Sequence, residues 1–347
     1  MIQSIEWLGD RLRFIDQSLL PLEERHSETA DVSVVADAIR TLKIRGAPLI
    51  GIAAAYGLAL AAAGSAESDP RRFHALLLKT AALLSGTRPT AVNLNWALQR
   101  LLGLVSPETP VEEARRILSA GAVAIHREDS AMCRRIGEHG AELVKNNSQI
   151  ITHCNTGALA TGGEGTALAV ITAAHRMGKS VKVFADETRP LFQGSRLTAW
   201  ELMKAGIDVT VITDSTAAAL MKKERIGCVI TGADRIASNG DAANKIGTYA
   251  LAIAARYHEI PFYIAAPSST IDAAVASGKE IPIEERNPEE VTDIHGYRTA
   301  PPGARVYAPA FDVTPAQLIT AIITEKGIYR SPYAFRKEKE REGVELQ

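Results

Sequence analysis

Apolar and polar residues follow two different patterns in the two halves of this chain. Along residues 5–14, apolar side chains alternate with polar ones on either side of Gly9 and Asp10, which predicts a small β-hairpin. From about Asp31 to Ile136 the apolar residues recur at helical spacing. The predicted helices cover residues 34–42, 50–63, 71–84, 92–102 and 111–142.

From Gln149 onward, short apolar runs alternate with helical stretches, which predicts βαβ units and a parallel sheet. Each run is nearly all apolar, as expected where helices cover both faces of a sheet. The predicted strands are Ile150 to His153, Val181 to Ala185, Val209 to Thr213, Cys228 to Thr231 and Phe262 to Ala265. We therefore predict an α/β fold with a mainly helical N-terminal domain and small β-hairpin (residues 1–125), and a C-terminal Rossmann-like, doubly wound parallel sheet (residues 126–347).

Composition and charge restrict the classes of function that this chain could have. The 347 residues include 39 Lys and Arg against 40 Asp and Glu, a net charge of -1, so the chain lacks the broad basic field that a nucleic-acid partner requires. Three scattered cysteines favour a reducing cytoplasm over a disulfide framework. We expect no signal peptide, and the Ala-rich stretch 49–64 reads as a buried helix rather than a membrane span.

Polar residues follow the predicted strands, where ligands bind in open α/β sheets. Cys154 could be a reactive thiol after the first strand, or a buried small hydrophobe, which is the commoner role of a single cysteine. Asp234 follows the fourth strand and suits acid/base work in a half-apolar pocket, although turn and N-cap aspartates are commoner. The sequence alone leaves both alternatives open.

Three arginines stand beside rigid turns and are candidate phosphate ligands. Arg45 precedes Gly46-Ala47-Pro48 at the start of a helix, and Arg88 and Arg189 each precede a proline. For each one separately, a solvated surface arginine is the commoner case.

Two other readings are weaker. Glycines at 162, 163 and 165, with Asp186 about twenty residues on, invite a dinucleotide site, but the GxGxxG spacing is not met. His153 beside Cys154 could suggest a cysteine hydrolase, with Asp186 distant in sequence. Adjacent strand residues point to opposite faces, so this interpretation is also weak.

Six motifs occur in order along the chain. They are residues 45–51, 88–94, 152–155, 187–190 and 193–202, and a last motif made of 232–236, 239–241 and 244–248. Together they resemble the methylthioribose-1-phosphate isomerase family, from about Arg45 to Tyr333. Ala308 departs from the family pattern, since asparagine is expected there.

The resemblance implies the aldose-ketose isomerisation of 5-methylthioribose 1-phosphate in methionine salvage, by a cytoplasmic homodimer without cofactor or metal. It also implies that Asp234 is the proton donor and that Cys154 stabilises or assists the transition state. The implied substrate-binding residues are Arg45, Gly46, Ala47, Arg88, Gln193, Asn244 and Lys245.

The expected chemistry follows from the phosphate on C1, which prevents a free aldehyde at that carbon. We expect Asp234, kept protonated by an apolar pocket, to protonate the ring oxygen. Hydrogen then moves from C2 to C1, either as a proton through Cys154 or as a hydride.

The sequence leaves three alternative functions open. The protein could be a related isomerase of 5-deoxyribose 1-phosphate or ribose 1,5-bisphosphate, a non-catalytic protein like the initiation factor 2B subunits, or an NAD-dependent dehydrogenase.

Overall fold

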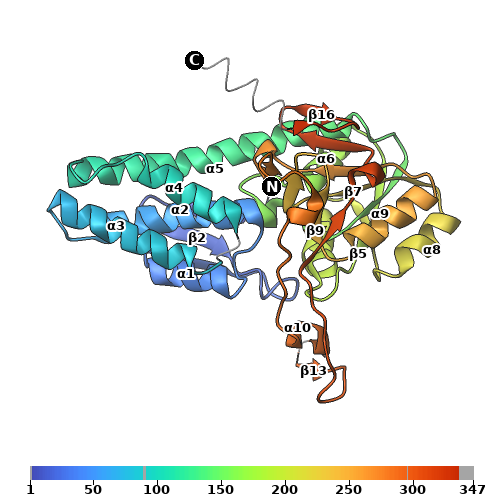
Figure 1. The fold of residues 1–347 in the computed structure, drawn as a ribbon, viewed down its shortest axis with the longest axis horizontal. Helices are drawn as coiled ribbons and strands as arrows, with labels where there is room; N and C mark the ends of the chain where they lie inside the picture. The colour runs from blue at the N-terminus through green and yellow to red at the C-terminus, as the bar shows by residue number, and fades with distance from the viewer. Residues whose placement is uncertain (1, 89–90, 295, 336–347) are drawn as a thin grey trace. The chain divides into compact units, whose positions relative to one another are not determined.

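The computed structural model of the chain describes residues 2–88, 91–294 and 296–335, and its residues form two compact units. The first unit comprises the residues up to Cys133 together with Gly157–Gly165, and the second comprises Arg134–Thr156 and the residues from Thr166 on. The division falls inside one long helix, α5 (Val111–Ala141), which Figure 1 shows in green.

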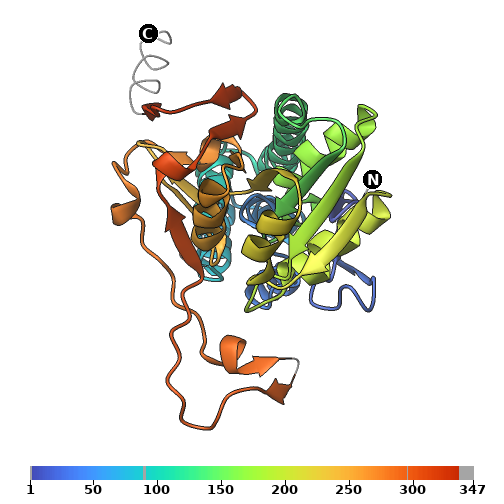
Figure 2. The ribbon, with the colours of Figure 1, turned by 90° about the vertical axis from the view of Figure 1, so that its right-hand side faces the viewer.

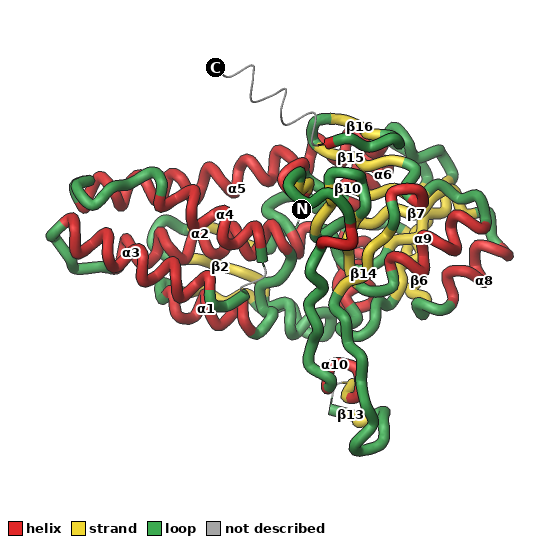
Figure 3. The backbone as a smooth tube through the Cα atoms, viewed as in Figure 1, coloured by secondary structure: helices red, strands yellow, loops and turns green. Residues whose placement is uncertain are grey.

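In the first unit, the predicted hairpin and helices are present. The hairpin of β1 (Ile5–Trp7) and β2 (Leu12–Ile15) is extended by a third antiparallel strand, β3 (His26–Thr29), which the sequence pattern did not reveal. Beyond these strands lie α1 (Val32–Arg40), α2 (Ala47–Gly64), α3 (Pro70–Ser85) and α4 (Val92–Leu102), followed by α5; Figure 3 shows helices in red.

Helix α2 is the core of the first unit. It is apolar on all sides and long enough to cross a membrane, but 72% of its residues are buried against α1, α3 and α4, so it is a core helix as predicted. Its N-cap is Gly46, with φ of 94°, and a Cβ there would lie 2.5 Å from the Cα of Ala160. Glycine is therefore required where α2 begins.

The second unit contains a sheet that, among the described residues, has seven strands in the order β16-β15-β10-β7-β4-β5-β6. All neighbouring strands are parallel except β16, which pairs antiparallel with β15. The five predicted strands are all present; β15 and β16 were not predicted. The strands are β4 (Ser148–Thr152), β5 (Val181–Asp186), β6 (Asp208–Ile212), β7 (Ile226–Thr231), β10 (Phe262–Ala265), β15 (Ala321–Thr324) and β16 (Gly327–Tyr329).

Helices cover both faces of this sheet, as Figure 2 shows for the second unit. Ile150 packs with α6 (Ala167–Arg176) and α7 (Ala199–Lys204), whereas its neighbour Ile151 packs with α8 (Thr216–Lys223) and α9 (Thr248–Tyr257). After β4 the chain forms β5 and β6 on one side and then crosses to β7 on the other side. The sheet is therefore doubly wound, as predicted, and its order reverses between β4 and β7.

A smaller sheet and a long excursion complete the second unit. The small sheet has the strand order β11-β8-β9-β14 and was not predicted. A segment containing α10 (Glu289–Thr292) extends away from the large sheet in both Figures 1 and 2. The remaining strands are β8 (Arg235–Ala237), β9 (Ala242–Lys245), β11 (Ile271–Asp272), β12 (Asp293–Ile294), β13 (Tyr297–Arg298) and β14 (Phe311–Thr314).

Candidate active site

The loops that follow β4 and β7 lie side by side at the carboxyl edge of the large sheet. The two strands are paired, with Thr152 opposite Ile230, and the Thr152 hydroxyl donates a 2.8 Å hydrogen bond to the Ile230 carbonyl. Cys154 follows β4 and Asp234 follows β7. The sheet order reverses between these strands, which is where open α/β sheets bind their ligands.

Cys154 is buried, with 8% of its surface exposed, and its backbone adopts the left-handed conformation with φ of 64°. Two buried hydroxyls hold this strained peptide: the Cys154 amide donates to Thr188 Oγ1 at 2.9 Å, and Thr198 Oγ1 donates to the Cys154 carbonyl at 2.6 Å. Non-glycine residues persist in this conformation only when their surroundings enforce it, and such residues cluster at functional sites.

The segment that supplies Thr198 also carries Gln193. Gln193 is buried and directly precedes a π-helical turn, Gly194–Thr198, before α7. No described group hydrogen-bonds its Oε1 atom. Asn155 donates to Thr198 Oγ1 at 3.2 Å and to the buried carboxylate of Glu201 at 2.7 Å, which ties this segment to the residue after Cys154.

Asp234 differs from the expectation, because its side chain is exposed rather than enclosed in an apolar pocket. The chain leaves β7 at Thr231 and turns before β8 begins at Arg235, so Asp234 stands in the open turn. Its backbone amide donates to the Ala243 carbonyl on β9 at 2.9 Å. Among the residues that the structure describes, this carboxylate is therefore exposed and lies in no apolar enclosure.

Asn244 and Lys245 end strand β9, which the Asp234 amide joins to the β7 loop. Asn244 is buried, and its Nδ2 donates to Thr248 Oγ1 at 3.0 Å, which in turn donates to the Lys245 carbonyl at 2.7 Å. The Lys245 ammonium lies 4.7 Å from the centre of the Phe311 ring. Both predicted substrate ligands thus belong to the same region of the second unit as Cys154 and Asp234.

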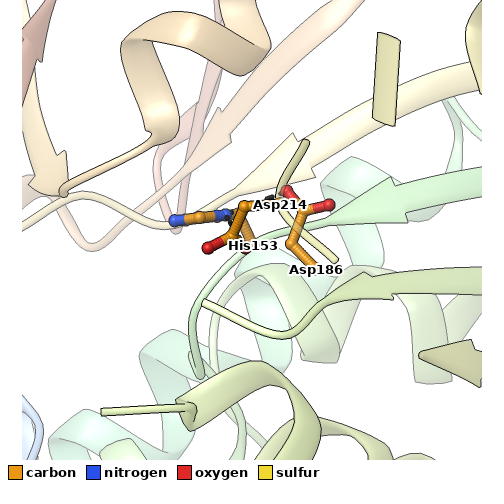
Figure 4. Close-up of side chains that lie close together, drawn as sticks. All are labelled: His153, Asp186 and Asp214. Carbon is orange, nitrogen blue, oxygen red and sulfur yellow. Dashed lines mark hydrogen bonds and ion pairs between the residues drawn. The ribbon is translucent and has the colours of Figure 1, made fainter. Parts of the chain in front are cut away.

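A cluster of one histidine and two aspartates, two of them buried and the third half-buried, lies next to the loop after β4. His153 Nδ1 lies 2.9 Å from Asp186 Oδ2 and 4.0 Å from Asp214 Oδ1 (Figure 4). His153 Nε2 lies 2.9 Å from the Ile246 carbonyl. Burial lowers the pKa of His153, but the hydrogen bond and charge of Asp186 and the charge of Asp214 outweigh it, so the pKa is raised. Burial raises the pKa of Asp186 to about 6, against the opposing effect of His153.

The position of His153 corrects one expectation. The assumption that residues 153 and 154 alternate on a strand is wrong, because β4 ends at Thr152. Asp186, although distant in sequence, lies beside the His153 ring. Both ring nitrogens of His153 already face other partners, so the cysteine-hydrolase reading gains no support.

His153, Asp186 and Asp214 are also the described residues whose possible metal-ligand atoms all lie within 4.8 Å of one another. Asp214, however, accepts hydrogen bonds from the Thr188 and Arg189 amides, each at 2.8 Å, and Nδ1 of His153 faces Asp186. We therefore assign this cluster to internal charge pairing.

The other predicted ligands, Arg45, Gly46, Ala47 and Arg88, belong to the first unit. Arg45 and Arg88 are half-buried. Pro89 and Thr90 of the predicted Arg88-Pro89-Thr90 turn lie outside the described residues.

Two further sequence features have structural roles. The Arg189 guanidinium donates to the Val291 carbonyl at 2.9 Å and to the Pro190 carbonyl at 3.2 Å, so backbone acceptors engage the arginine proposed as a phosphate ligand. The glycines of the weak dinucleotide motif lie in the first unit, where the Gly162 amide donates to Asp129 at 2.6 Å.

Sequence reasoning did not single out His153, Thr188, Thr198 or Glu201 for the roles they have here. His153 directly follows β4 and Thr188 lies two residues after the end of β5, and this placement was the available signal. Thr198 and Glu201 become relevant only through tertiary hydrogen bonds to the Cys154 region.

The sequence model of the initiation factor 2 subunit family matches residues 43–331, so the chain belongs to that family. This result agrees with the helical first unit and the doubly wound sheet of the second.

Within this class, the chain groups with the methylthioribose-1-phosphate isomerases, which confirms the resemblance seen in the sequence. The methylthioribose-1-phosphate isomerase of Heliobacterium modesticaldum is 54% identical over 334 residues, covering 96% of this chain and 97% of that protein. The solved 5-methylthioribose 1-phosphate isomerase of Pyrococcus horikoshii is 44% identical, with a TM-score of 0.93 over 99% of this chain and 96% of that one.

A second solved structure carries a different description. It is the A. fulgidus protein described as translation initiation factor eIF-2B, subunit delta, which is also 44% identical, with a TM-score of 0.90 over 98% of this chain and 99% of that chain.

Proposed function

We propose that the chain is an aldose-ketose isomerase that converts 5-methylthioribose 1-phosphate to 5-methylthioribulose 1-phosphate in methionine salvage. The observation that carries this proposal is the placement of Cys154 and Asp234 on the loops after the two strands where the sheet order reverses. The isomerases of this name, which match almost the full chain, support the substrate.

Asp234 begins the reaction as a general acid. Its carboxyl group protonates the ring oxygen, the bond between C1 and that oxygen breaks, and the positive charge at C1 is shared with the phosphate ester oxygen. An exposed carboxylate is ionised at neutral pH in the free protein. The bound phosphate dianion and the loss of water around Asp234 both favour its protonated form, so we infer that substrate binding prepares the acid.

Hydrogen transfer from C2 to C1 follows. In one route the Cys154 thiolate removes the C2 proton, an enol forms between C1 and C2, and the thiol returns the proton to C1. In the other, hydride moves directly from C2 to C1. In either route the C2 hydroxyl loses its proton to the Asp234 carboxylate, which restores the acid, and C2 becomes the ketone. No external oxidant or reductant is consumed.

Substrate binding is assigned first to residues of the second unit near Cys154. We assign the buried Oε1 of Gln193 to a substrate hydroxyl, since an unpaired buried acceptor is costly until a ligand satisfies it. Asn244 and Lys245 contact the same substrate. The family resemblance also implies substrate contacts for Arg45, Gly46, Ala47 and Arg88.

The direct test is to incubate the purified chain with 5-methylthioribose 1-phosphate and to follow ketose formation by NMR, with the 5-deoxy analogue and ribose 1,5-bisphosphate in parallel. We expect the methylthio compound to have the highest kcat/KM. A higher value for either analogue would reassign the substrate, and no turnover of any of the three would refute the isomerase.

The fate of the C2 hydrogen separates the two transfer routes. A C2-deuterated substrate in ordinary water keeps its deuterium at C1 if hydride moves. Loss of the label to solvent indicates a proton route through Cys154.

The A. fulgidus structure favours a second candidate, a non-catalytic initiation-factor subunit. The presence of both Cys154 and Asp234 argues for the enzyme. Isomerase turnover that depends on these two residues decides between the candidates.

We also propose a cytoplasmic homodimer. Tyr249, Ile253 and Tyr257 recur every four residues on α9 and are 40%, 46% and 82% exposed, a large apolar stripe for a free surface. Light scattering should give twice the 37.2 kDa chain mass, and a mass of one chain would refute the dimer.

A further inference from the structure

His153 is a buried side chain to which the proposed reaction gives no role, although it adjoins Cys154. It is 1% exposed, and three acidic side chains surround it: Asp186 at the end of β5, Asp214 after β6 and Asp312 on β14. Glu187 adds negative charge behind Asp186. A neutral imidazole would leave this acidic cluster uncompensated, so the surroundings favour a positively charged ring.

The hydrogen-bond partners of the ring determine where its protons lie. The Ile246 carbonyl can only accept, so Nε2 of His153 carries a proton. Nδ1 faces a carboxylate oxygen of Asp186 at 2.9 Å, and both oxygens of Asp214 accept backbone amides. With a second proton on Nδ1, His153 is an imidazolium that donates one hydrogen bond from each ring nitrogen.

The acceptor of the Nε2 proton belongs to the segment that carries two proposed substrate ligands. Ile246 directly follows Asn244 and Lys245, and its own amide donates to the Ala310 carbonyl at 3.0 Å. The next residue, Gly247, has φ of 104°, and a Cβ there would lie 2.8 Å from Cε1 of His153. The turn after β9 therefore packs directly against the imidazole ring.

We propose that His153, as an imidazolium, is a positioning residue that holds the Ile246 carbonyl and so sets the Asn244-Lys245 substrate ligands against the loop that carries Cys154. It does not touch the reacting atoms. The predicted effect on KM rests on the proposed isomerase function. The predicted charge and hydrogen bonds of the His153 ring rest only on the geometry of the second unit.

Two amide substitutions separate the two hydrogen bonds of the ring. His153→Gln places an amide nitrogen near the position of Nε2 and keeps the donor to Ile246, whereas His153→Asn places one near Nδ1 and keeps only the donor to Asp186. We expect His153→Asn to raise KM about tenfold, the effect of losing about 1.4 kcal/mol of binding, with a smaller change in kcat. His153→Gln should recover most of that loss. His175→Gln, at an exposed position on α6, is the matched control.

The result that overturns the positioning role is equal damage by the two variants, or a loss confined to kcat. Circular dichroism and thermal unfolding of each variant show whether it is folded.

A measurement on the unmodified protein tests the charge of His153 without substrate. In protein labelled with 15N-histidine, we expect both ring protons of His153 to be visible at neutral pH and its pKa to lie above the ordinary value of histidine. A neutral ring with a single proton overturns the proposal even if neither variant folds. If the protein fails to turn over the sugar phosphate, the proposed function fails, while this NMR result still decides the state of His153.

Discussion

The loops after β4 and β7 carry the two proposed catalytic groups, yet the structure prepares them very differently. Cys154 is buried, and its strained peptide is held by Thr188 and Thr198 on either side. Asp234 stands exposed in an open turn, with its amide bonded to β9. The comparison indicates that the thiol of Cys154 is positioned before substrate arrives. The surroundings that favour the protonated form of Asp234, in contrast, form only when substrate covers it.

Loss of the acid should have the largest effect. Asp234→Asn removes the transferable proton but keeps the shape, so we expect turnover to fall by about 10³ to 10⁴, in the upper range for general acid catalysis, while substrate still binds. Steady-state kinetics and calorimetric binding measure the two quantities. Asp208→Asn, at an exposed position on β6, is the control. Near-normal turnover by Asp234→Asn would remove this residue from the mechanism.

Loss of the thiol should be the next largest effect. We expect Cys154→Ala to reduce kcat by at least about 10², because the proposed mechanism has its thiol assist the transition state. Cys228→Ala is the matched control, since Cys228 is a buried cysteine inside β7 and should affect thermal stability more than turnover. Equal kinetic losses in the two variants would contradict a specific role for Cys154.

Loosening the peptide of Cys154 tests whether its position is preset. Thr198→Val leaves the Cys154 carbonyl without its hydroxyl donor, which should cost about 1–3 kcal/mol of unfolding free energy. We also expect kcat to fall by about ten- to a hundredfold, since small misplacements of reacting groups are costly. Thr198→Ser keeps the hydroxyl and should recover kcat. If valine leaves kcat unchanged, the thiol does not depend on this constraint.

The smallest expected effect is a dependence of stability on pH. The pKa of His153 is raised in the folded protein, so its contribution to stability is fully present below the unfolded value of 6.5 and is lost as pH rises through the folded value. The difference in unfolding free energy between wild type and His153→Gln should therefore shrink as the pH is raised from below 6.5 to above the folded pKa of His153. Denaturant unfolding measures it. A difference that grows over this interval would contradict the assignment.

The regular elements could be predicted because their apolar patterns are long or strong. Helix α2 and strands β4, β5, β6, β7 and β10 fall close to their predicted ranges. Strand β9 was missed because Ala-Ala-Asn-Lys has little strand preference, and it forms by pairing with the distant β14. The pairing of His153 with Asp186 was missed because Cys154 turns left-handed, which ends the strand alternation.

The candidate site was predictable only in part. Strand-end placement pointed to Cys154 and Asp234, and the family resemblance supplied the substrate ligands. The exposure of Asp234 and the hydroxyls around Cys154 depend on residues that are distant in sequence, such as Thr198, and no local pattern encodes such contacts.

Kinetics of the double variant Cys154→Ala/Asp234→Asn test most directly whether the two loops serve one reaction. In the proposed mechanism the acid opens the ring and the thiol assists the following hydrogen transfer. The protonated ketone formed at the end loses its proton readily even without Asp234, so the slower of the two steps alone should limit the rate. We predict that the double variant turns over about as fast as the slower single variant. A loss equal to the product of the two single losses would contradict this division into successive steps.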